Sequence, residues 1–215
     1  MIKGLNCIDF IKKQIIHLKF DTQADLCKTF LRFQEYYESP KFKNKYFTLN
    51  EIKIDYKGNT NKKFTYYTDW VGFNIPSKIL KPFREGKFGE LSTREKSFLK
   101  IFDYFKGKYY IIGTCVDDDE YTITLNHELV HAVYYLNSEY RKKVKKIISE
   151  YPFVNSLKTY LEHRGYHKST FHDEINAYLA TGENITKKET DSNCYLTLQK
   201  NLKILFNQYK SLYIK

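Results

Sequence analysis

The spacing of apolar residues along the chain predicts a mainly helical protein with a few strands in its middle. Apolar positions recur every three or four residues over 8–18 and again over 26–37, which indicates two amphipathic helices. Thr22 can cap the second of them, and Ser39-Pro40 ends it. The same spacing predicts later helices over 92–105, 141–151 and 153–163, and one long or two shorter helices over 187–213. It also predicts a helix that Thr122 or Thr124 caps and that runs to Leu136 or Asn137.

The middle of the chain has a pattern that is more typical of strands. Short runs of aromatic and β-branched residues lie within 46–67, on either side of a turn expected at 57–59. A helix over 48–56 stays open, because Thr48 and Glu51 also have the spacing of a capping box. A further strand is predicted over 108–116.

Residues 68–76 form an aromatic stretch with a central glycine, Gly72, and a closing proline, Pro76. They combine apolar surface with polar side chains and backbone groups, which suits the wall of a substrate-binding site. The same composition suits a packed loop, and both interpretations stay open.

The sequence His127-Glu128-Leu129-Val130-His131 lies within the helix that follows the predicted strand. Two histidines four residues apart project from one face of a helix, so that their rings can bind one metal ion. A glutamate beside the first of them suits a general base that takes a proton from water. With 6 His among 215 residues, chance would produce this pattern about 0.01 times. The segment therefore predicts a zinc site with hydrolase chemistry.

Charge alters this interpretation only slightly. The net charge is +11, and only five of the 36 basic residues are arginine. Lysine spread over a surface gives solubility and weak, salt-sensitive binding to phosphates, which does not predict specific recognition of a nucleic acid.

The four cysteines are far apart and indicate neither a disulfide framework nor a thiolate zinc site. Lysines interrupt the apolar runs near the start, so we expect no secretory signal, and no run reaches the ~18 apolar residues of a membrane span. These features predict a cytoplasmic protein without a membrane partner, in its own cell or, if it is viral, in the host cell.

A third metal ligand is expected on a second helix, because an open catalytic zinc site uses three protein ligands. Glu174-Ile175-Asn176-Ala177 follows His131 by about forty residues. Together with the HELVH sequence, this segment resembles the gluzincin group of zinc metallopeptidases, in which a glutamate on a second helix completes the site. The resemblance, which covers about 120–140 and 170–180, implies that His127, His131 and Glu174 hold zinc.

Two features of this segment keep other assignments open. Asp173 could replace Glu174 as the ligand, as in an aspzincin-like site. The thermolysin-like relatives carry an aspartate one turn after the ligand glutamate to orient a zinc histidine, but this chain has Tyr178 there. Asp173 or a carbonyl group could take over that role. The metzincin pattern is excluded because residues 134 and 137 are not glycine and histidine.

Attack on an amide places negative charge on the carbonyl oxygen, and a tyrosine or histidine near the metal can stabilise it. Tyr166 and His167 are the first candidates, because their segment is expected to form a loop over the cleft before the ligand helix. His172 and Tyr178 are also close to Glu174 in the sequence.

Taken together, the sequence predicts an α+β, zincin-like fold in which a small twisted sheet packs on the metal helix, with further helices on both sides. One catalytic domain would span 1–215, with a helical and sheet part at 1–105, a metal-binding core at 106–182 and C-terminal helices at 183–215. The expected function is hydrolysis of a peptide or protein substrate, with zinc as cofactor and Glu128 as base. The alternative is a basic protein that binds nucleic acid or a host factor on a non-catalytic scaffold of the same kind.

Overall fold

A computed structural model of the chain describes residues 2–11, 14–59, 63–183, 185 and 193–213. Within these residues the chain forms a small mixed four-stranded sheet, ten α-helices and two short 3-10 helices, so the expected α+β class is confirmed. No helix in the described part of the chain has the length and apolar character that a membrane span requires.

The sheet has the strand order β1-β2-β4-β3. Its strands are β1 (Leu5–Ile11), β2 (Ile15–Phe20), β3 (Gly72–Pro76) and β4 (Tyr110–Cys115). β2 runs parallel to β4, whereas β1 and β3 run antiparallel to their neighbours. β3 therefore forms one edge of the sheet.

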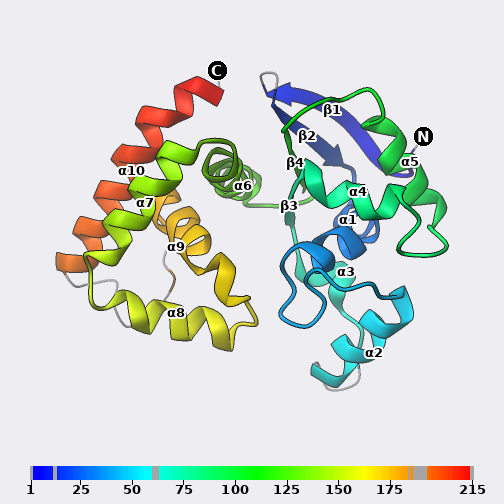
Figure 1. The fold of residues 1–215 in the computed structure, drawn as a ribbon, viewed down its shortest axis with the longest axis horizontal. Helices are drawn as coiled ribbons and strands as arrows, with labels where there is room; N and C mark the ends of the chain where they lie inside the picture. The colour runs from blue at the N-terminus through cyan, green and yellow to red at the C-terminus, as the bar shows by residue number, and fades with distance from the viewer. Residues whose placement is uncertain (1, 12–13, 60–62, 184, 186–192, 214–215) are drawn as a thin grey trace.

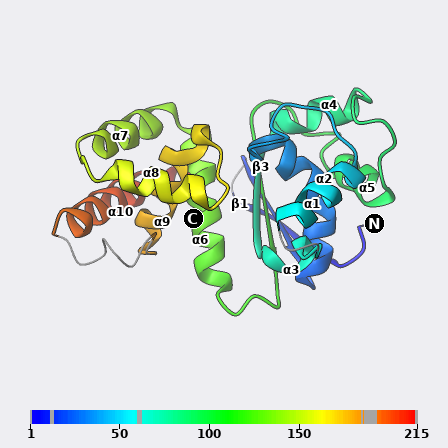
Figure 2. The same cartoon turned by 90° about the horizontal axis from the view of Figure 1, so that it is seen from below.

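Helices cover both faces of this sheet (Figures 1 and 2). One face packs on α1 (Gln23–Glu38). The N-terminal half also contains α2 (Leu49–Asn59), α3 (Tyr66–Asp69), α4 (Leu80–Arg84) and α5 (Thr93–Ile101). The opposite face packs on α6 (Tyr121–Leu136). Beyond α6 the chain adds α7 (Ser138–Ser149), α8 (Val154–His163), α9 (Phe171–Thr181) and α10 (Asn193–Tyr213). The 3-10 helices are η1 (Ser77–Ile79) and η2 (Lys168–Thr170).

The central helix α6 belongs to two hydrophobic clusters, and this fixes its orientation. Leu129 and Ala132 pack on the sheet residues Tyr110 and Ile112, whereas Val130 lies in the cluster formed with α7 to α10. A helix with two buried sides has only a narrow remaining face. In α6 that face carries the two histidines and borders the cleft between the halves of the molecule.

Two helix starts confirm the capping signals in the sequence. The Thr22 side chain accepts a hydrogen bond from the backbone N–H of Asp25 at the start of α1. Ser92 and Glu95 form a capping box at the start of α5, which ends at Ile101 rather than near 105. The N-cap of α6 is Glu120, so the expected caps, Thr122 and Thr124, lie inside the helix.

The helix expected over 8–18 is wrong, because its described part belongs to the antiparallel strands β1 and β2. β2 lies in the interior of the sheet, and five of its six residues, Ile15 to Leu18 and Phe20, are buried. A strand that is buried on both faces has a nearly continuous apolar run, which periodicity alone does not separate from a helix. Residues 12–13 lie outside the described part.

The strands expected within 46–67 are also wrong, and the alternative of a helix over 48–56 is confirmed. Thr48 and Glu51 form the reciprocal contacts of a capping box at the start of α2. The turn expected at 57–59 is the end of the same helix, and residues 66–69 form the short helix α3. The capping box decided the local structure there, against the aromatic and β-branched composition.

The predicted strand over 108–116 and the helices predicted after the HELVH sequence are confirmed. β4 occupies the strand expected over 108–116, and α7 and α8 match the helices expected there. Residues 68–76 end in the edge strand β3, and several of them line the cleft. The helix expected over 187–213 is α10, and residues 187–192 lie outside the described part.

Candidate metal centre

His127 and His131 lie one turn apart on the face of α6 that borders the cleft. Their ring centroids are 4.9 Å apart. Both rings are largely buried, with exposed fractions of 14% for His127 and 3% for His131. The spacing in the sequence thus brings two imidazoles together, as a shared metal ion requires.

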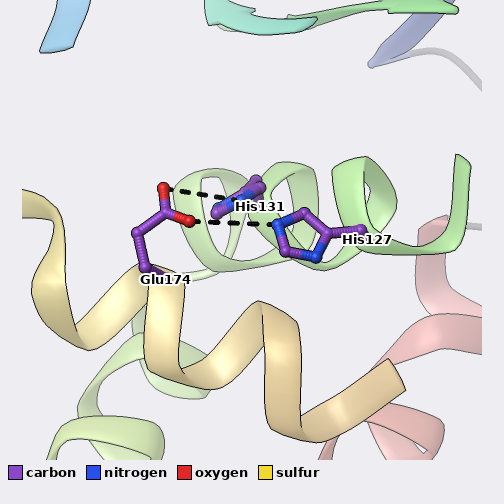
Figure 3. Close-up of side chains that lie close together, drawn as sticks. All are labelled: His127, His131 and Glu174. Carbon is purple, nitrogen blue, oxygen red and sulfur yellow. Dashed lines mark ion pairs between the residues drawn. The ribbon is translucent and has the colours of Figure 1, made fainter. Parts of the chain in front are cut away.

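Glu174 approaches these histidines from α9, which packs against α6 (Figure 3). Its Oε2 atom lies 3.9 Å from Nε2 of His127, and its Oε1 atom lies 3.8 Å from Nε2 of His131. Ala177, one turn further along α9, is fully buried in the cluster between these helices. A small side chain at this position allows the two backbones to approach closely.

One ligand atom from each of these three side chains lies within 4.8 Å of the others. Tetrahedral zinc with bonds of 2.0–2.2 Å places its ligand atoms about 3.4 Å apart, so the three side chains would move closer together to bind one ion. Two nitrogens and one oxygen are donors that zinc accepts, with a fourth position left open. The residues therefore fit a catalytic metal ion.

The Nδ1 atoms of the two histidines contact carboxylates behind the centre. Nδ1 of His131 lies 2.9 Å from Oδ1 of Asp173, and Nδ1 of His127 lies 3.0 Å from Oε1 of Glu183. A carboxylate at Nδ1 fixes the ring and leaves Nε2 free for a metal ion. In this geometry Asp173 supports His131 from behind, and Glu174 faces both Nε2 atoms.

Glu183 was not among the predicted site residues, and Tyr178 offers no carboxylate to orient a histidine. The ring of Tyr178 instead packs against His127, with their centroids 4.7 Å apart. Gly182 ends α9 with a left-handed conformation, φ 88°, and turns the chain so that Glu183 meets His127. The hydroxyl of Thr181 donates to Glu183 Oε1 at 2.7 Å. An acidic residue directly after the glycine that ends the ligand helix was the available signal.

The protonation of the histidines reflects the surplus of carboxylates around them. Burial lowers the pKa of His131, but the charges of Asp173 and Glu174 outweigh it and raise the pKa to about 9. Burial likewise opposes the protonation of His127, but the carboxylates of Glu174 and Glu183 bring its pKa well above the ordinary value. The cluster thus favours positive charge, which either protons or a metal ion can supply.

Glu128 lies beside the three ligand residues but does not belong to their group. Its Oε2 atom accepts a hydrogen bond of 2.5 Å from Nδ2 of Asn74 on β3. Its Oε1 atom lies against the backbone at Gly72, where an added Cβ would collide with it. Burial raises the pKa of Glu128, and the positive charge of the histidines opposes this effect. A carboxylate fixed next to the cluster is suitably placed for a general base.

A cleft of about 930 Å³ lies in front of this group. Tyr166 and His167 both line it, together with the C-terminal end of α1 and with Trp70 to Asn74, apart from Val71. The hydroxyl of Tyr166 lies 3.1 Å from that of Tyr178, and Nδ1 of His167 lies 2.8 Å from Oγ of Ser169. The structure thus brings both candidate donors to the cleft of the metal group, while His172 does not line it.

We expect Glu183→Gln to weaken zinc binding by about 10-fold to 100-fold, because His127 would lose the carboxylate that holds its ring. Titration against a chromogenic chelator measures the affinity. Glu150→Gln makes the same change at an exposed residue beyond α7 and should leave the affinity unchanged. Equal affinities in wild type and Glu183→Gln would contradict the assigned role.

Comparison of the chain with protein-family models, with curated proteins and with solved structures found no match.

Proposed function

We propose that the protein is a zinc-dependent peptidase of the gluzincin type, with a zincin-like arrangement of its metal helices. The proposal rests on one observation. His127, His131 and Glu174 place three ligand atoms within 4.8 Å at the cleft, and Glu128 stands beside them without belonging to the ligand set. A purely structural zinc site has no use for an additional carboxylate in this position.

The donor set favours zinc, which binds imidazole nitrogen and carboxylate oxygen in catalytic sites with one open position. Bound there, zinc would supply a Lewis acid that polarises a carbonyl group and makes water more acidic. Glu128 would take a proton from the attacking water and give it to the nitrogen of the leaving amine. Tyr166 or His167 would donate a hydrogen bond to the carbonyl oxygen as negative charge develops on it.

A peptide substrate suits the shape of the cleft. β3 is an edge strand of the sheet, and Gly72, Phe73 and Asn74 line the cleft. An extended peptide can pair with the backbone of an edge strand, which would place a peptide bond in front of the metal group. The cleft is also large enough for several residues of a peptide, since ligand sites commonly have about 300–1,000 Å³.

Zinc content and peptide cleavage test the proposal together. We expect the purified protein to contain one zinc ion per chain and to cleave members of a mixed peptide library. A chelator should abolish the cleavage, and added zinc should restore it. Cleavage that persists after the metal has been removed would contradict the mechanism. A zinc-loaded protein that cleaves no peptide would contradict the activity and favour a binding protein on this scaffold.

A further inference from the structure

A buried hydrogen-bonded chain leads from the sheet to Glu128. The hydroxyl of Tyr110 on β4 donates to Oδ1 of Asn74 on β3, and Nδ2 of Asn74 donates to Oε2 of Glu128 at 2.5 Å. Their exposed fractions are 0% for Tyr110, 6% for Asn74 and 7% for Glu128. Burying a polar side chain costs folding free energy unless the group is hydrogen-bonded. Three buried polar side chains linked by hydrogen bonds therefore indicate a specific role.

The register of the sheet places the first two of these side chains together. Asn74 is opposite Ile112 on β4, and Tyr110 lies two residues from Ile112 on the same strand. Residues two apart on a strand point to the same face, so Tyr110 and Asn74 are diagonal neighbours. Tyr110 belongs to the cluster that the sheet forms with α6. Both side chains therefore lie on the face of the sheet that carries the metal helix.

The direction of each hydrogen bond determines the orientation of the next side chain in this hydrogen-bonded series. A carboxamide can rotate by half a turn and exchange its oxygen for its nitrogen. The Tyr110 hydroxyl bonds the oxygen of Asn74, so the nitrogen is directed to Glu128. Glu128 accepts this bond with Oε2, while Gly72 leaves room for Oε1. Both oxygens of the base are thus placed by residues of the sheet.

We propose that Asn74 is a positioning residue that holds the Glu128 carboxylate in the orientation needed for proton transfer, with Tyr110 fixing the Asn74 amide. The proposal rests on the proposed peptidase function. It assigns a specific role to the edge strand in addition to any contact with the substrate. It also explains why residue 72 is a glycine, since any Cβ there would displace Oε1 of Glu128.

The first test is the kinetics of Asn74→Ala with zinc content measured in parallel. A misplacement of about 1 Å can cost 10²-fold in rate, so we expect kcat to fall about 10-fold to 100-fold. KM should stay within about twofold, because the substrate would still bind as before. An increase in KM with kcat unchanged would show that Asn74 binds the substrate instead, and would overturn the proposal.

A double-mutant cycle separates action through Glu128 from any other effect of Asn74. If Asn74 acts only through the base, Asn74→Ala should cause no further loss in kcat in a Glu128→Gln background. A loss of the same size in both backgrounds would mean that Asn74 acts on the substrate or on the fold, and would contradict the inference. Thermal unfolding of each variant shows whether it is folded.

Tyr110→Phe tests the second step of the chain, and the protein contains a matched control. Tyr140 is also fully buried, and its hydroxyl donates to Oδ1 of the buried Asn176 at 3.0 Å. The substitution Tyr140→Phe therefore removes a comparable hydrogen bond that does not lead to Glu128. We expect kcat to fall about threefold to tenfold in Tyr110→Phe and to stay unchanged in Tyr140→Phe. Equal effects on kcat would overturn the role of Tyr110.

A binding measurement makes the test independent of peptide cleavage. Acetohydroxamate chelates zinc and can give a proton to a neighbouring carboxylate, so its affinity for the zinc-loaded protein should depend on the placement of Glu128. We expect Asn74→Ala to weaken its binding about tenfold in the wild-type background and not at all in the Glu128→Gln background. This result without peptide cleavage would contradict only the peptidase function. Unchanged binding in Asn74→Ala would overturn the role of Asn74, and a protein that binds no zinc would overturn both.

Discussion

Glu128→Gln should retain at most about one-hundredth of the wild-type rate of peptide hydrolysis, because general-base catalysis contributes ~10²–10⁴-fold. The side chains of glutamate and glutamine have nearly the same shape. The glutamine Oε1 atom can still accept the hydrogen bond from Nδ2 of Asn74, so the packing around the site should be preserved. What disappears is the group that accepts a proton from water.

Zinc content distinguishes this loss from damage to the metal site. Glu128 lies outside the group formed by the two histidines and Glu174, so the variant should bind zinc with the affinity of the wild type. Glu128→Asp provides a matched control, since it keeps the carboxylate but withdraws it by about one methylene group, and its rate should lie between the other two. Hydrolysis at the wild-type rate in Glu128→Gln would rule out the proposed mechanism.

Glu174→Ala should lose zinc along with activity. Removal of a ligand atom leaves two histidines, which hold zinc poorly. The loss of zinc affinity should exceed the 10–100-fold loss that is typical when a residue hydrogen-bonded to a metal ligand is mutated. Zinc that binds only the folded protein raises the free energy of unfolding, by about 4 kcal/mol at a thousandfold excess of zinc over Kd. The melting temperature of the wild type should therefore rise with added zinc, and that of Glu174→Ala should not.

Asp173→Ala is the decisive comparison for this assignment. Asp173 contacts Nδ1 of His131, while Glu174 faces Nε2 of both histidines. We therefore expect Asp173→Ala to weaken zinc binding by about 10-fold to 100-fold without abolishing it. Full zinc occupancy in Glu174→Ala together with loss of zinc in Asp173→Ala would reverse the roles of the two residues.

Local sequence signals determined those parts of the structure that depend on neighbouring residues alone. The hydroxyls of Thr22 and Ser92 cap α1 and α5 because a cap needs only a side chain and backbone N–H groups up to three residues away. His127 and His131 share one face of α6 because the helical repeat requires it. These features could be predicted because each residue and the group that it contacts lie within about one helical turn.

The tertiary structure decided the parts in which partners are distant in the chain. Whether 8–18 forms a helix or strands depended on β4, which pairs with β2 from almost a hundred residues away. The contact of Glu183 with His127 depends on the packing of α9 on α6, which the sequence pattern did not specify. Asn74 meets both Tyr110 and Glu128 only because two strands pair in one register beneath α6. The sequence could indicate the candidate base and all three candidate ligands. The contacts of Asn74, Tyr110 and Glu183 around them are set by long-range packing, for which local periodicity carries no signal.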